Sequence, residues 1–142
     1  MAAGYRVTHL DDIETVRFPG EPHPDWKPLR RDLGITAFGT NAYVGAEPGD
    51  LVIDRHDELD EGAPGGAEEM YVVVRGAARF TVDGTQLDVP QGGVVAIGDP
   101  ALLRDAVALE ADTLVLAVGA EPGVPFTPSD WEEKFLARGV RG

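Results

Sequence analysis

Hydrophobic residues occur in short runs that alternate with polar residues and are separated by turn formers. This pattern predicts strands at 5–10, 35–44, 51–58, 70–74, 77–82, 85–89, 94–97, 102–109 and 113–118. Asp83 and Gly84, between two of these runs, are a strong hairpin signal. Residues 18–28 contain four prolines and predict an irregular segment, which we expect Trp26 to anchor. Short, evenly spaced strands are typical of an all-β sandwich or barrel.

One helix is predicted at the end of the chain, over residues 128–138. Thr127 can serve as N-cap and is followed by Pro at the first helical position, and Gly139 can end the helix. Trp131 and Phe135 lie four residues apart and therefore share a face. We expect this face to pack on the chain's own barrel or on a neighbouring subunit.

Length and composition limit the function classes. A chain of 142 residues is long enough for one domain with a buried core. We divide it into an N-terminal strand with a Pro-rich extension (1–34), a barrel (35–119) and a C-terminal extension (120–142). A net charge of -13 argues against binding to nucleic acid or to an anionic membrane. The chain has no cysteine, no apolar run long enough to span a bilayer and no signal-peptide pattern, so we expect an acidic cytoplasmic protein.

Candidate chemistry gathers between residues 49 and 76. His56 and Glu58 lie two residues apart at the end of a predicted strand, so their side chains can converge. Glu69 and Tyr71 likewise share one face of the next strand. Because two neighbouring carboxylates disfavour each other's ionisation, we expect a cationic group between Glu58 and Glu69 if they meet.

These residues resemble the first sequence motif of the cupin superfamily, which contains small jelly-roll barrels also described as RmlC-like. The motif's Gly, His-x-His pair, Glu and second Gly fall on Gly49, His56, Glu58, Glu69 and Gly76. The spacing from Glu69 to Gly76 matches the family, whereas that from Gly49 to His56 is one residue longer. The resemblance covers about residues 35–119 and implies an all-β, cupin-type jelly-roll barrel with a short C-terminal α-helix.

The resemblance leaves the ligand positions open. Since the gap between Glu58 and Glu69 is several residues too long, a second alignment places the two His positions near Gly62 and Pro64, whose side chains cannot bind a metal. In the second motif Gly98, Pro100, Leu103 and Val107 stand where the family has Pro, Gly, His and Asn. Arg104 follows Leu103, and a register slip of one residue decides which of the two faces the pocket.

Three interpretations of the cluster follow. The family's metal site has three His and one Glu, and here His56, Glu58 and Glu69 remain as candidate ligands of a divalent metal. Alternatively, the pocket is metal-free and His56 carries protons near neutral pH. In the third interpretation His56 and Arg104 neutralise buried carboxylates in a structural network.

Our first functional hypothesis is a non-standard cupin that binds a small molecule in its barrel without an intact metal site. Its ligand-binding residues would be His56, Glu58, Glu69, Tyr71 and Arg104. One alternative is a metal-dependent enzyme of oxygenase or isomerase type, with His56, Glu58 and Glu69 as ligands. Another is a structural barrel without a ligand. The resemblance and the terminal extensions imply a homodimer, and the sequence leaves open whether the protein is an enzyme.

Overall fold

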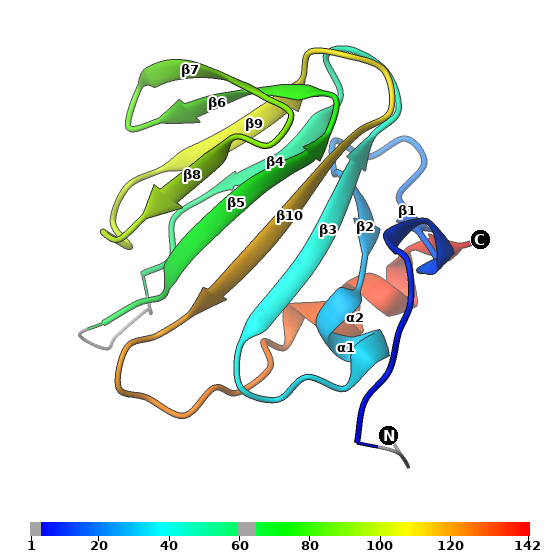
Figure 1. Cartoon of the computed structure of the whole chain (residues 1–142), viewed down its shortest axis with the longest axis vertical. Helices are drawn as coiled ribbons and strands as arrows, with labels where there is room; N and C mark the ends of the chain where they lie inside the picture. Colours follow the sequence, from blue (N-terminus) through cyan, green and yellow to red (C-terminus); the bar gives the residue numbers. More distant parts are fainter. Residues whose placement is uncertain (1–3, 60–64) are drawn as a thin grey trace.

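Two antiparallel sheets pack face to face around the hydrophobic core (Figure 1). The computed structural model describes residues 4–59 and 65–142. The larger sheet has the order β11-β1-β2-β3-β10-β5-β8, and the smaller one has the order β4-β9-β6-β7. In the described residues no helix is long and apolar enough to cross a membrane.

The elements have the following bounds. The strands of the larger sheet are β1 (Val16–Arg17), β2 (Asp25–Lys27), β3 (Gly39–Gly45), β5 (Glu68–Arg75), β8 (Val94–Ile97), β10 (Thr113–Ala120) and β11 (Val140–Arg141). Those of the smaller sheet are β4 (Leu51–His56), β6 (Ala77–Val82), β7 (Thr85–Pro90) and β9 (Arg104–Ala108). The helices are η1 (Leu10–Asp12), α1 (Leu29–Leu33) and α2 (Trp131–Arg138). This architecture confirms the predicted all-β jelly roll with a short C-terminal helix.

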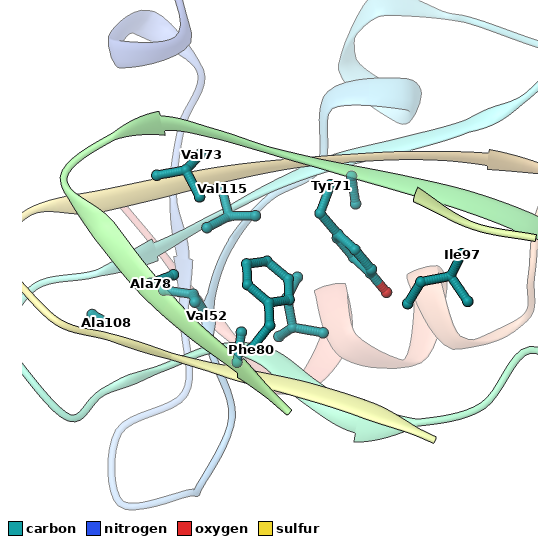
Figure 2. Close-up of a cluster of buried hydrophobic side chains, with 11 residues drawn as sticks. Val52, Tyr71, Val73, Ala78, Phe80, Ile97, Ala108 and Val115 are labelled. Carbon is teal, nitrogen blue, oxygen red and sulfur yellow. The ribbon is translucent and has the colours of Figure 1, made fainter. Parts of the chain in front are cut away.

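Strand alternation fills the space between the sheets with apolar side chains. On β5, Tyr71 and Val73 point inward and are at most 1% exposed, whereas Met70 between Glu69 and Tyr71 is 40% exposed. Phe80 enters from the opposite sheet, and Figure 2 shows it between the ribbons beside Tyr71. Because Glu69 is the next inward residue on β5, the apolar filling ends at Tyr71 and a polar region begins there.

The predicted hairpin at Asp83 and Gly84 is confirmed. Both residues have positive φ, 48° and 82°, as a two-residue type I′ turn requires, and Val82 pairs with Thr85 across it. Asp tolerates this conformation better than most residues, and Gly adopts it without strain.

Two predictions for the N-terminal region were wrong. Residues 5–9 form no strand; the chain instead forms η1, and Tyr5 and Val7 are 72% and 86% exposed. The alternating apolar side chains of residues 5–9 therefore do not pack against the core. The segment 18–28 is not wholly irregular, because it contains β2, which pairs with β3. Trp26 on β2 is fully buried and does anchor this segment.

The C-terminal helix begins later than predicted, at Trp131 instead of residue 128. Asp130 is its N-cap and forms no side-chain capping bond, so Thr127 does not cap the helix. The Trp131 ring lies 5.1 Å from the Trp26 ring, and the Phe135 ring lies 5.4 Å from the Phe18 ring. The apolar face of α2 thus packs on the chain's own body, as one of the two alternatives predicted.

Candidate functional site

His56 lies at the end of β4, where the strand is irregular. Its Cα pairs with that of Arg104 on β9, and register shifts occur on both sides of Ile53. These shifts let Ile53 and His56 reach the same cleft although they lie three residues apart. The backbone N–H of Glu58 donates to the carbonyl of Pro100 at 2.9 Å, which holds the segment after β4 against the barrel.

The predicted cation between the two carboxylates is His56. Its Nε2 lies 2.8 Å from Glu58 Oε1 and 3.6 Å from Glu69 Oε1, and its Nδ1 lies 2.6 Å from the carbonyl oxygen of Asp54. Since both ring nitrogens face acceptors, only the doubly protonated ring satisfies them all. Burial by itself lowers the pKa of His56, but the hydrogen bonds to Glu58 and the Asp54 carbonyl and the nearby Glu69 carboxylate outweigh it and raise this pKa to about 10.

Arg104, and not Leu103, turns inward. The Arg104 side chain is fully buried, donates from Nη1 to Glu69 Oε1 at 3.1 Å and from Nε to the Leu102 carbonyl at 2.9 Å. Leu103 is 36% exposed. The sequence left the register of β9 open. In the structure this register keeps Leu103 out of the site and places the Arg104 guanidinium in it.

Glu69 is the centre of this network. The Tyr71 hydroxyl donates to Glu69 Oε1, the same oxygen that Arg104 binds. Burial raises the pKa of Glu69, but the neighbouring His56, the hydrogen bond from Tyr71 and the charge of Arg104 overcome it, so the pKa of this carboxyl is lowered. Burial and the neighbouring Glu69 charge raise the pKa of the Tyr71 hydroxyl. Two cations thus face two carboxylates, and the cluster is balanced in charge.

The cluster lies at a cleft of about 970 Å³ that opens between the barrel and the chain segment leading into α2. Its lining includes Tyr43 of β3 and, on the other wall, Phe126 and Trp131. The sequence prediction did not include these residues. Tyr43 lay in a predicted strand, and the alternation of side chains along that strand could have shown that it points inward. The second wall could not be predicted in this way, because it depends on how the C-terminal segment folds back.

Four of the five predicted site residues line the cleft, namely His56, Glu58, Glu69 and Tyr71. Arg104 lies behind Glu69 and is not part of the lining, so its contact with a ligand stays a prediction. The alternative His positions at Gly62 and Pro64 lie outside the described residues.

The cluster has the composition of a possible metal site. Ligand atoms of His56, Glu58 and Glu69 lie within 4.8 Å of one another, and no other such group occurs in 4–59 and 65–142. The bond from His56 Nδ1 to a backbone carbonyl is one that metal-binding imidazoles commonly make. Against this, Glu69 Oε1 is already bound by Tyr71 and by the positively charged Arg104. The residues therefore fit a three-ligand site in part.

Solved structures with the same fold include proteins described as cupins. A sugar phosphate isomerase from a cupin superfamily, from Silicibacter pomeroyi, superimposes with a TM-score of 0.64 at 20% identity over 87% of this chain and 77% of that one. A predicted oxalate decarboxylase from Thermotoga maritima gives 0.60 at 17% identity over 80% and 97%. KdgF from Halomonas sp. gives 0.55 at 19% identity over 80% and 86%. No protein-family model and no curated protein matches the chain. At these identities the similarity establishes the fold and not the activity.

Proposed function

Since the chain has the fold of the cupin superfamily, we propose that it binds a small organic molecule in the cleft at the barrel mouth, without an intact metal site. One observation carries this proposal: a charge-balanced network of His56, Glu58, Glu69 and Arg104 lies beside an open cleft of about 970 Å³. Clefts of roughly 300–1,000 Å³ with a few convergent polar groups are typical of small-molecule sites.

The network offers fixed hydrogen-bonding groups to a ligand. Arg104 and Tyr71 hold Glu69, and His56 holds Glu58, so these polar groups are oriented before a ligand arrives. Such preorganisation favours binding because little side-chain freedom is lost. The apolar part of a ligand would contact the aromatic residues Tyr43, Phe126 and Trp131 of the lining.

The test is a binding screen by NMR. A set of small polar metabolites of varied charge is added to ¹⁵N-labelled protein, and the indole N–H signals of the two tryptophans are followed. Trp131 lines the cleft, whereas the indole N–H of Trp26 donates to Asn41 Oδ1, and Trp131→Phe assigns the signals. Binding in the cleft shifts the Trp131 signal and is weakened in Glu58→Gln. If no molecule of the set shifts any signal of a cleft residue, the proposal is wrong.

The second candidate function is that of a metal-dependent enzyme, which the close approach of His56, Glu58 and Glu69 favours. These three residues would hold a divalent metal once His56 Nε2 has lost its proton, and the metal would supply Lewis-acid chemistry. Metal content is measured in protein purified without chelator and after loading with Mn²⁺, Ni²⁺ or Zn²⁺. Stoichiometric metal that is lost in His56→Ala supports this function, and no metal under any loading condition contradicts it.

We also propose that the protein is a homodimer, on the basis of the resemblance and the terminal extensions. Light scattering at micromolar concentration tests this directly, and a monomeric mass would contradict it.

A further inference from the structure

We infer that the ligand of the cleft is an organic cation of the amine class, held by carboxylates and aromatic rings. This inference rests on the proposed function and adds the chemical class of the ligand. It does not depend on the second candidate function, because the carboxylates without an ion pair that carry it, Asp54, Asp57 and Asp130, are not among the candidate metal ligands.

The charge of the cleft is the first support. Its described lining has three basic side chains, His23, Arg30 and His56, and seven carboxylates. The seven are Asp54, Asp57, Glu58, Glu69, Glu121, Asp130 and Glu132.

The basic residues of the described lining already have partners. Arg30 Nε lies 3.0 Å from Glu132 Oε2, His56 Nε2 lies 2.8 Å from Glu58 Oε1, and His23 Nδ1 lies 2.8 Å from the Pro24 carbonyl oxygen. An anionic ligand would therefore meet only basic side chains that are already engaged. Its entry would also add negative charge to a region that already has an excess of it, at a cost that grows as water is excluded.

Several carboxylates have no cationic partner. Among residues 4–59 and 65–142, Asp54, Asp57 and Asp130 form no ion pair, and the hydrogen bonds that Asp54 and Asp57 accept come from backbone N–H groups. Asp54 and Asp57 flank His56 on one wall of the cleft, and Asp130 begins α2 on the other. A cation between these walls would gain attraction from both.

Tyr43 marks the inner end of the negative region. Burial and the charges of Glu69, Glu58, Glu132 and Asp54 raise the pKa of its hydroxyl, so four carboxylates lie near it. The Tyr43 side chain lines the cleft, and a phenol oxygen can accept a hydrogen bond from an ammonium group.

Aromatic rings complete the site. Tyr43, Phe126 and Trp131 belong to the lining, and Trp131 is fixed by its contact with Trp26. Aromatic faces attract ammonium groups and exclude anions, and a cation is bound most strongly where such rings stand beside carboxylates. Rings and carboxylates thus favour the same class of ligand.

The test compares three molecules of similar size: 2-phenylethylammonium, 2-phenylethanol and phenylacetate. Each is titrated into the full chain by calorimetry and NMR, at low and at high salt. We expect the cation to bind at millimolar concentration or below, more tightly than the other two, and to shift the Trp131 signal. Its affinity should fall as salt screens the carboxylates.

Two double variants locate the effect. Asp57→Asn with Asp130→Asn removes two charges from the cleft walls, and we expect the affinity for the cation to fall roughly threefold to fivefold. Glu47→Gln with Glu110→Gln removes the same charge from turns at the opposite end of the barrel and should leave the affinity unchanged.

The outcomes separate this inference from the proposed function. If 2-phenylethanol or phenylacetate binds the cleft as tightly as the cation, the class of ligand is wrong while the binding function stands. If the cation does not bind but neutral or anionic molecules of the NMR screen bind, the class of ligand is again wrong and the binding function again stands. If nothing binds, both fail. Equal losses in the two double variants would also overturn the inference, because the effect would then be one of net charge.

Discussion

The Arg104 guanidinium binds Glu69 Oε1 at 3.1 Å while its side chain is completely shielded from solvent. The pair joins the two sheets, since Arg104 is on β9 and Glu69 is on β5. The neighbouring His56, the Tyr71 hydroxyl and the Arg104 charge together lower the pKa of Glu69 and so keep it ionised at the cleft. A buried cation with one carboxylate partner makes the stability of the fold depend on the site.

We expect Arg104→Met to lower the free energy of unfolding by about 3 kcal/mol, because it leaves Glu69 without its buried cation. The double variant Arg104→Met with Glu69→Gln should recover part of this loss, since no unpaired charge remains. Urea unfolding followed by circular dichroism measures both. A single variant as stable as the wild type would show that the pair is not buried as described.

The pKa of His56 predicts a particular dependence on pH. Because the folded pKa is raised to about 10 from an ordinary value near 6.5, protonated His56 stabilises the fold fully below pH 6.5. This contribution is lost as the pH rises from 6.5 to 10. The stability difference between wild type and His56→Gln should therefore be largest in acid and shrink over this range.

NMR of the imidazole gives a direct check on the same residue. At pH 8 the ring should still show the ¹⁵N shifts of an imidazolium, with both nitrogens protonated. In Glu58→Gln its pKa should fall, because one of the hydrogen bonds that raise it loses its charge. A neutral ring at pH 7 in the wild type would contradict this assignment.

Much of the fold was predictable because its strands pair with neighbours whose patterns are strong. Alternation on β5 and the turn at Asp83 and Gly84 are local signals, and both were confirmed. The short strands β1 and β2 were not predictable in the same way. Val16 pairs with Arg141 and with Trp26, so β1 exists only because distant segments meet. The alternation at 5–10 was misleading because no partner strand lies there.

The candidate site was predictable in its residue types and less so in its geometry. Sequence spacing brought His56 and Glu58 together, and His56 lies between the two carboxylates, where a cationic group was expected. The choice between Leu103 and Arg104 depended on the irregular pairing of β4 with β9, which no residue spacing reveals. The aromatic wall of the cleft depended on where α2 docks.

The inward position of Arg104 predicts how a metal site could be built. Arg104→His should place a second imidazole beside Glu69 and increase the affinity for Ni²⁺, because it adds a ligand and removes a positive charge. Leu103→His, which follows the family motif, should not increase it, since this side chain is partly exposed to solvent. Calorimetric titration with Ni²⁺ compares the two variants. Tighter binding in Leu103→His alone would mean that the register of β9 is wrong.

Two neighbouring ion pairs of α2 provide the final prediction. Glu132 binds Arg30 with both partners at most 11% exposed, whereas Glu133 binds Arg31 with the carboxylate 72% exposed. Glu132→Gln should lower the free energy of unfolding by about 2 kcal/mol, because Arg30 loses its charged acceptor in a buried position. Glu133→Gln should change it by less than about 0.5 kcal/mol, since water screens the exposed pair.

Hydrogen exchange measures the local consequence of the same two substitutions. Amides of α2 should exchange faster in Glu132→Gln than in Glu133→Gln, because the buried pair connects α2 to α1 and thereby fixes the wall of the cleft that contains Trp131. Ligand affinity should also fall in Glu132→Gln, because a mobile wall of the cleft must be ordered when the ligand binds. Equal exchange in the two variants would mean that the aromatic contacts of Trp131 and Phe135 hold the helix without help from this pair.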